Sequence, residues 1–234
     1  MSNNIIVGLQ KLTLLDYPGR IACTLFTRGC NFRCPFCHNA SLVVHPDEQK
    51  PYENNELLAF LKKRSGILDG VCITGGEPTL MPGLRDLIAQ IKEIGYSVKL
   101  DTNGTRPAVL KSLIEEKLVD YVAMDIKNSP KKYAVTIGLH DMYDISPIIE
   151  SKDILMSGCV DFEFRTTVAK PFHEESDFYE IGEWLRGDEK YYLQQFKDSG
   201  DIIGQGIISC NESEMEKFLN ILLPFVPNAQ LRGV

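Results

Sequence analysis

Three cysteines stand close together, at Cys30, Cys34 and Cys37, in the segment CNFRCPFC of residues 30–37. Spacings of four and then three residues let three thiolates converge on one metal centre from a single loop. A structural iron–sulfur or zinc site normally closes with a fourth protein ligand, whereas a catalytic site keeps one position open for another molecule. The segment therefore predicts three corners of a [4Fe–4S] cluster whose fourth iron is free for a substrate or cofactor.

A structural zinc loop is the alternative for these cysteines. His38 is the candidate fourth ligand, but it directly follows Cys37, and adjacent residues rarely reach one tetrahedral ion together. No second Cys-x2-Cys or His pair follows at zinc-finger spacing. The sequence therefore favours the iron–sulfur cluster over zinc.

Net charge and hydropathy limit the partners and the location of the chain. Its 234 residues carry a formal net charge of -7. An acidic chain has no general attraction for polyphosphate, so we expect no nucleic-acid partner, although a local basic patch could still exist. Residues 1–4 begin no signal peptide, and no stretch approaches the length of a membrane span. We therefore expect a soluble, cytoplasmic protein without a membrane partner.

Cysteine usage points to a reducing compartment. The chain has seven cysteines, and those outside the loop, Cys23, Cys72, Cys159 and Cys210, stand singly among apolar neighbours. This pattern is typical of a reduced intracellular protein rather than of a disulfide framework. We expect these four to be small buried hydrophobic residues and not metal ligands.

Short β-like runs alternate with amphipathic helical runs along the chain, which is the pattern of parallel βα units. The predicted strands are residues 21–27, 71–74, 97–101, 120–127, 161–168 and 191–196, and the predicted helices are residues 53–64, 84–94, 108–118, 146–156, 177–186 and 213–225. This order predicts an α/β fold, a partial parallel (β/α)6 barrel. No linker rich in Pro, Gly or Ser divides it, so we expect one domain over residues 1–234, with the cluster loop at 28–39 and a C-terminal helix at about 213–225.

A Gly-Gly-Glu-Pro run, residues 75–78, follows the second predicted strand. The active site of such a fold forms from loops at the carboxyl ends of its strands, and this run lies at such an end. Gly75 and Gly76 let a backbone approach a ligand closely, and the carboxylate of Glu77 can receive an ammonium group. The alternative is an ordinary Gly-Gly turn with a solvated Glu, which the neighbouring cysteine loop disfavours.

Charged residues stand at the ends of the next strands. Asp101 and Thr102 open the run Asp-Thr-Asn-Gly, which is either an oxygen-rich corner near a cofactor or a helix-capping loop. Asp125 and Lys127 are two residues apart on one strand and share a face, where they either project into the barrel mouth or form a surface ion pair. Arg165 lies in an apolar strand and should be paired or ligand-facing, because a lone buried charge is costly. His45, His140 and His173 stand alone in polar stretches and are interpreted as surface residues.

Two of these motifs resemble the radical S-adenosylmethionine (radical SAM) superfamily. Its signature is Cys-x3-Cys-x-aromatic-Cys, in which Phe36 is the aromatic residue, and its GGEP motif is similar to residues 75–78. The resemblance narrows to glycyl-radical-enzyme activases through residues 12–20 (LTLLDYPGR), 37–39 (CHN), 101–104 (DTNG) and 124–127 (MDIK). The chain length and the Tyr-Pro-Gly lead are most similar to the longer form of anaerobic ribonucleoside-triphosphate reductase-activating proteins. The resemblance covers residues 10 to about 170.

The resemblance implies one [4Fe–4S] cluster on Cys30, Cys34 and Cys37 that binds SAM through its unique iron. A low-potential electron, from a flavodoxin- or ferredoxin-type donor, then cleaves SAM to methionine and a 5′-deoxyadenosyl radical, which takes a hydrogen atom from a glycine of a partner enzyme. The implied site residues are as follows: Phe36 beside the adenine, Gly75, Gly76 and Glu77 at the methionine amino group, Asp101 and Thr102 at a monovalent cation, and Asp125, Lys127 and Arg165 near the SAM carboxylate and ribose.

The sequence differs from those of some activases in two features, which limits what the resemblance implies about the partner enzyme. Pyruvate formate-lyase activase carries a cofactor-contacting His in a late strand, whereas residues 191–196 here read YYLQQF. Some activases carry a cysteine-rich insert for two extra clusters, but residues 39–71 contain no cysteine, so we expect one cluster only. The leading hypothesis is activation of anaerobic ribonucleotide reductase. The alternatives are another glycyl radical enzyme such as pyruvate formate-lyase, a small-molecule or RNA substrate, and a non-catalytic iron–sulfur redox sensor.

Overall fold

The computed structural model describes residues 6–139 and 143–234. The expectation of no signal peptide at residues 1–4 and the surface assignment of His140 lie outside these residues. Strands β2 to β7 follow one another in the sheet and pair in parallel, as predicted. The described strands are β1 (Ile6–Thr13), β2 (Ala22–Thr27), β3 (Gly70–Gly75), β4 (Ser97–Thr102), β5 (Tyr121–Asp125), β6 (Asp161–Lys170), β7 (Tyr191–Gln195), β8 (Ile208–Ser209) and β9 (Gln230–Arg232).

Both edges of the sheet carry strands that the sequence pattern did not indicate. Strand β1 pairs antiparallel with β2 at one edge, and the short β9 pairs parallel with β7 at the other. Strand β8 pairs antiparallel with the end of β6. These additions leave the predicted α/β fold with a parallel sheet unchanged.

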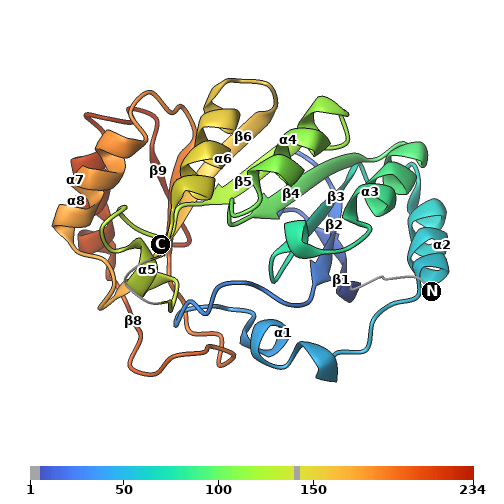
Figure 1. Cartoon of the computed structure of the whole chain (residues 1–234), viewed down its shortest axis with the longest axis horizontal. Coiled ribbons are helices and arrows are strands. Elements are labelled where there is room, and N and C mark those ends of the chain that lie inside the picture. The colour runs from blue at the N-terminus through green and yellow to red at the C-terminus, as the bar shows by residue number, and fades with distance from the viewer. Residues whose placement is uncertain (1–5, 140–142) are drawn as a thin grey trace.

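Helices cover the outer side of the curved sheet. In Figure 1, α2, α3, α4 and α6 follow one another around the sheet, α7 and α8 lie at its far end, and the segment from β2 into α1 crosses the opposite side. The described helices are α1 (Ala40–Val44), α2 (Asn54–Arg64), α3 (Leu84–Glu93), α4 (Pro107–Glu115), α5 (Tyr133–Thr136), α6 (Ser146–Met156), α7 (Glu175–Trp184) and α8 (Glu212–Leu222), with 3-10 turns at Pro46–Glu48 and Pro78–Leu80. No helix in the described part of the chain combines the length and hydropathy that a membrane crossing requires.

The C-terminal helix is shorter than predicted. Helix α8 begins at Glu212, where the Asn211 side chain accepts a hydrogen bond from the Glu214 N–H and forms a capping box. It ends at Leu222 rather than near residue 225, because Pro224 has no N–H to continue the helical hydrogen bonds.

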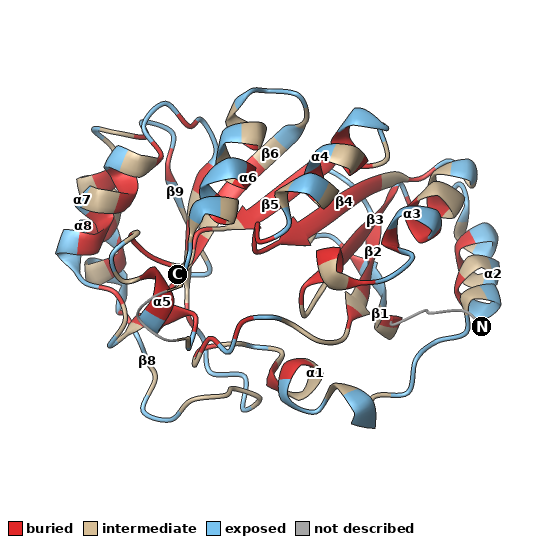
Figure 2. Cartoon of the chain, in the orientation of Figure 1, coloured by how far each residue is buried: buried red, intermediate tan, exposed pale blue. Residues whose placement is uncertain are grey.

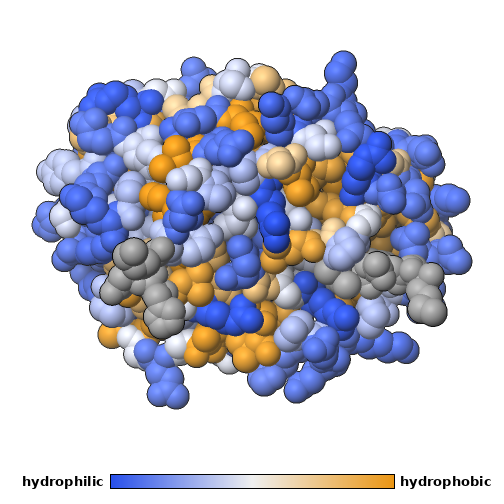
Figure 3. Space-filling view, in the orientation of Figure 1, coloured by the Kyte–Doolittle hydropathy of each residue, from blue (hydrophilic) through white to orange (hydrophobic). Residues whose placement is uncertain are grey.

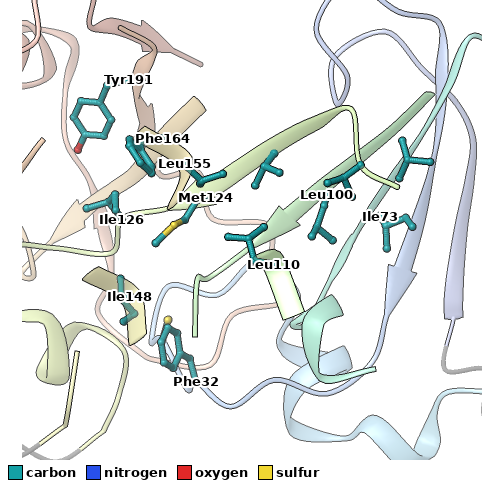
Figure 4. Packing of buried hydrophobic residues seen from close by; sticks show 14 of the residues in the cluster. Phe32, Ile73, Leu100, Leu110, Met124, Ile126, Ile148, Leu155, Phe164 and Tyr191 are labelled. Atoms are coloured by element: carbon teal, nitrogen blue, oxygen red, sulfur yellow. The ribbon is translucent and has the colours of Figure 1, made fainter. Parts of the chain in front are cut away.

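Residues on the strands alternate between two environments. On β4, Val98 and Leu100 pack toward the helices, whereas Lys99 and Asp101 point to the inner side, where their side chains form an ion pair. Figure 4 shows the outer layer, with Leu100, Met124 and Phe164 of the sheet near Leu110 of α4 and Ile148 and Leu155 of α6. The sheet is mostly buried along its length (Figure 2). Parallel sheets are commonly covered on both faces.

The surface view adds the distribution of side chains on one face. Hydrophilic residues gather around the margin of the face in Figure 3, with hydrophobic groups between them.

Cys23, Cys72 and Cys210 are buried, as expected, but Cys159 is exposed. The prediction for Cys159 was wrong because this residue lies in the exposed turn between α6 and β6, where its thiol lies 3.2 Å from the Ser157 hydroxyl.

Candidate active site

A cavity lies at the carboxyl ends of the parallel strands, between the cysteine loop and the inner face of the sheet. All the site residues expected from the sequence line this one cavity: Cys30, Cys34, Phe36, Cys37, Gly75, Gly76, Glu77, Asp101, Thr102, Asp125, Lys127 and Arg165. They come from the loop after β2, from the last residues of β3, β4 and β5, from the loops that follow β3 and β5, and from β6 itself. Parallel strands bring these ends to one edge of the sheet, which is why positions more than a hundred residues apart meet.

The cysteine loop runs from the end of β2 to the start of α1, within the predicted residues 28–39. Its Cys30 thiol accepts hydrogen bonds from the Phe32 N–H at 3.3 Å and, more weakly, from the Asn103 side-chain amide at 3.8 Å. A turn between Cys34 and Cys37, with the Cys37 N–H donating to the Cys34 carbonyl at 3.0 Å, brings the second and third thiols back toward the cavity.

Burial makes the free thiols weak acids. It raises the pKa of Cys30 to about 11 and that of Cys34 to about 12, and it also raises the pKa of Cys37. The Lys127 ammonium acts against burial at all three thiols because it favours the thiolate form. Thiolates are the ligands of iron, so cluster binding releases protons from these cysteines and depends on pH.

The donor set fits a [4Fe–4S] cluster. Fe–S clusters are held by cysteine thiolates, each on a different iron, and N–H groups aimed at the sulfurs tune them. Within residues 6–139 and 143–234, no three His, Cys, Asp or Glu side chains are placed to share a single metal ion. A cubane does not require its three thiolates to meet at one point, and these three line one cavity that remains open to a further ligand.

The glycines after β3 let the loop pack directly on the cysteine loop. Gly75 has φ of +117°, a left-handed conformation that side chains disfavour, and a Cβ on Gly76 would lie 1.9 Å from the Gly29 carbonyl oxygen. The Asn39 side chain also donates to the Gly75 carbonyl at 3.0 Å. The two loops that the sequence motifs identify are therefore in backbone contact.

Glu77 connects the loop after β3 with the end of β4. Its Oε1 accepts from the Thr102 hydroxyl at 2.8 Å and from the Thr79 N–H and hydroxyl, whereas Oε2 accepts the Asn103 N–H at 2.7 Å. Each carboxylate oxygen has about two acceptor positions, and Oε2 has the single donor Asn103, so Oε2 retains capacity for one more. Burial raises the pKa of Glu77, and these hydrogen bonds oppose that rise.

A chain of ion pairs crosses the inner face from β4 to β6. The Arg165 guanidinium contacts Asp101 Oδ2 at 3.0 Å and Asp125 Oδ1 at 2.6 Å, and Lys127 contacts Asp125 Oδ2 at 2.8 Å. Burial would raise the pKa of Asp125, but Arg165 and Lys127 outweigh it and hold that pKa well below its usual value. Arg165 is therefore paired, which is one of the two outcomes expected for it from the sequence.

Phe36 is held by residues from the turn that follows β6. Its ring lies 5.5 Å from that of Phe172 and 6.0 Å from that of His173. The surface assignment of His173 was wrong, since only 5% of the residue is exposed and its Nε2 lies 2.9 Å from the Lys127 carbonyl. That partner is 46 residues away in sequence, so no local pattern could indicate it. His45 is exposed, as expected.

Other cavity residues received no individual site assignment from the sequence. They are Phe32, His38, Asn39, Val43, Thr74, Asn103, Thr167 and Gln194. Thr167 and Gln194 follow the inward alternation of Arg165 and Tyr192, which is the signal that could have found them. Gln194 occupies the late strand, where the sequence has no His.

The segment after β7 packs on the outside of the cysteine loop. The Gly204 N–H donates to the Pro35 carbonyl at 2.8 Å, and the Phe196 ring stacks on His38 at 5.2 Å. The Asp201 carboxylate accepts from the Ser41 N–H at 3.1 Å and from its hydroxyl at 2.8 Å. The cysteine loop is therefore positioned from both sides of the cavity.

Comparison with known proteins places this geometry in a family. The model of the radical SAM superfamily matches residues 24–150. A Methanocaldococcus jannaschii protein that bears the name glycyl-radical enzyme activating enzyme is 32% identical over 239 residues, covering 98% of this chain and 96% of that protein. The pyruvate formate-lyase-activating enzyme of Staphylococcus aureus is 33% identical over 131 residues, so this match spans only 52% of this chain and 52% of that enzyme.

Solved structures agree at the level of the fold. Streptococcus suis SuiB bound to S-adenosylmethionine superposes with a TM-score of 0.66 at 12% identity, over 88% of this chain and 48% of that chain. The likeness is consistent with a partial TIM-type barrel. Members of the superfamily use a [4Fe–4S] cluster and SAM. The chain thus belongs to the radical SAM superfamily and, within it, to the glycyl-radical-enzyme activating enzymes, which are oxidoreductases.

Proposed function

We propose that this chain installs a glycyl radical on a separate enzyme, and that this partner is an anaerobic ribonucleoside-triphosphate reductase. The observation that carries the proposal is the cavity in which three cysteines face the loop after β3 and the charged inner face of the sheet. A cluster held there would supply the electron that cleaves SAM to methionine and a 5′-deoxyadenosyl radical. A flavodoxin- or ferredoxin-type protein would deliver the electron.

The residues of the cavity would hold SAM by its charged ends. The spare acceptor of Glu77 and the backbone of Gly75 and Gly76 suit the ammonium group. Lys127 and Arg165, both positively charged, suit the carboxylate and the ribose hydroxyls. Phe36 is buried against Phe172 and offers an aromatic surface for adenine. Together these groups would fix the orientation of SAM against the cluster.

Two features support the reductase as the partner. The chain length and the Tyr-Pro-Gly lead at residues 17–19 are most similar to those of reductase activases, and the absence of cysteine from residues 39–71 favours an activase with one cluster. The match to pyruvate formate-lyase-activating enzyme covers only about half of the chain. That match nevertheless makes pyruvate formate-lyase the second candidate.

The test is the formation of a glycyl radical in the presence of each candidate partner. The anaerobically reconstituted protein is reduced and mixed with SAM and either purified anaerobic ribonucleotide reductase or purified pyruvate formate-lyase. We expect a glycyl radical by electron paramagnetic resonance, with one 5′-deoxyadenosine per radical, only with the reductase. A radical only on pyruvate formate-lyase would contradict the choice of partner, and 5′-deoxyadenosine without a radical on either would contradict both.

A further inference from the structure

The inner face of β4 carries a buried lysine that neither the sequence motifs nor the proposed function uses. Lys99 is 1% exposed, and its ammonium forms an ion pair with Asp101 Oδ1. Asp101 lines the cavity, whereas Lys99 lies two residues earlier on the same face and therefore deeper in the barrel. The strand thus places a protein cation directly beneath a carboxylate of the proposed SAM site.

Both oxygens of Asp101 are engaged by positive charges of the protein. Oδ1 receives the Lys99 ammonium, and Oδ2 receives the Arg165 guanidinium at 3.0 Å. The neighbouring Thr102 hydroxyl donates to Glu77 and accepts the Gly104 N–H at 3.1 Å. The side-chain oxygens of Asp101 and Thr102, the residues that the resemblance placed at a monovalent cation, therefore already have partners within the chain.

The local charge also disfavours an added cation. Across β4, β5 and β6, the connected ion-pair network joins Lys99, Lys127 and Arg165 to Asp101 and Asp125, and the nearby Glu163 carboxylate is paired with Arg232, so the positive groups of this set outnumber the negative ones by one. A metal ion beside Asp101 would meet two cations at short range, in a buried site where charges are weakly screened. The residues present do not fit the cation that the resemblance implied.

We propose that the Lys99 ammonium takes the place of a monovalent metal ion beside Asp101, so that this chain binds SAM without added K⁺ or Na⁺. Lys99 keeps the carboxylate neutralised and fixed by a group that is part of the fold. This inference rests on the proposed SAM site but does not depend on the partner enzyme. Salt composition, at constant ionic strength, therefore has little effect on SAM affinity.

The test is SAM binding to the anaerobically reconstituted protein, measured by equilibrium dialysis in choline, sodium or potassium chloride at one ionic strength. For the natural sequence we expect dissociation constants that agree within about twofold among the three salts. An affinity that rises about fivefold or more when K⁺ or Na⁺ replaces choline would overturn the inference without any variant. Absence of binding in every salt would overturn both the inference and the proposed SAM site.

Substitutions at Lys99 sharpen the test. Lys99→Met should weaken SAM binding in choline about tenfold, the scale of one charge-assisted hydrogen bond, and potassium chloride should recover much of that loss. Lys99→Arg keeps the charge and should stay independent of the salt. The matched control is Lys92→Met, which breaks an ion pair with Asp120 away from the cavity and should bind SAM like the natural sequence. A Lys99→Met protein that is equally indifferent to K⁺ would contradict the role of Lys99.

Discussion

The two faces of the central sheet differ in the residues that they carry and in what holds those residues. On the outer face, Leu100, Met124 and Phe164 pack against helices and are stabilised by the removal of apolar surface from water. On the inner face, Asp101 and Arg165 occupy alternate positions of the same strands and are held by ion pairs. Adjacent residues of one strand therefore serve stability on one side and ligand recognition on the other.

This difference indicates that the charged residues of the inner face stabilise the fold less than apolar residues of similar size would. Taking charges out of water costs free energy that their mutual attraction only partly offsets, whereas apolar residues of similar size stabilise without that penalty. Retaining charges there is explained by a charged ligand, such as SAM. Substitutions on the outer face should therefore change mainly the free energy of unfolding, whereas substitutions on the inner face should also change the affinity for SAM.

The largest expected effect is at the cysteine loop. Cys34→Ala removes one of three thiolates and should abolish both the iron–sulfur absorbance and 5′-deoxyadenosine formation, because a cubane with two protein ligands is not retained. Cys159→Ala is the matched control, since that cysteine is exposed and outside the cavity. Full 5′-deoxyadenosine formation by Cys34→Ala would sink the cluster assignment.

The next largest effect is expected from a substitution at the centre of the inner face. Arg165→Met leaves Asp101 and Asp125 without the guanidinium that joins them. Loss of one partner of a buried pair typically lowers the free energy of unfolding by about 3–5 kcal/mol, and SAM affinity should fall by about a hundredfold. Urea unfolding and equilibrium dialysis measure the two quantities. Unchanged SAM affinity in a folded Arg165→Met protein would show that the inner charges do not serve binding.

A substitution on the outer face should lower the stability of the fold without lowering the affinity for SAM. Leu100→Ala leaves a cavity in the outer core and should lower the free energy of unfolding by about 2–5 kcal/mol. Dissociation constants for SAM should stay within about twofold, because Leu100 points away from the cavity. A large loss of SAM affinity at temperatures where the variant is folded would break the distinction between the faces.

The smallest effect concerns a carboxylate that lacks the ion pairs of the inner face. Asp188 is buried, its Oδ2 has no hydrogen-bond partner among the described residues, and burial raises its pKa to about 6. The folded state therefore holds a proton that the unfolded state loses near pH 4, so this residue makes the protein less stable as the pH rises from about 4 to about 6. The pairs of Asp125 act in the opposite direction, since they depress its pKa.

Asp188→Asn removes the titrating group. Relative to the natural sequence, the variant should gain about 1–3 kcal/mol in the free energy of unfolding between about pH 4.5 and pH 7.5. Urea unfolding of the two proteins at both pH values gives this difference directly and cancels the titration of the other carboxylates. A difference that does not change with pH would show that Asp188 is ionised in the folded state throughout this range.

Much of the fold follows from local patterns. The strands from residue 22 to residue 195 lie within a few residues of their predicted bounds, because strand and helix periods are properties of neighbouring residues. The edge strands β1 and β9 were missed since they contain little alternation of their own and are defined by pairing with β2 and β7. The end of α8 at Leu222 reflects Pro224, a signal present in the sequence.

The sequence by itself determined the chemistry of the candidate site. The spacing of Cys30, Cys34 and Cys37 and the glycines before Glu77 are read within single loops, and their positions at strand ends predict that they meet. Only the tertiary structure decided which charges pair. The register of β5 on β6 sets Asp125 opposite Arg165, and the packing of distant segments buries His173 and brings Gln194 into the cavity. Such partners depend on strand register and packing across the whole fold, which no local pattern encodes.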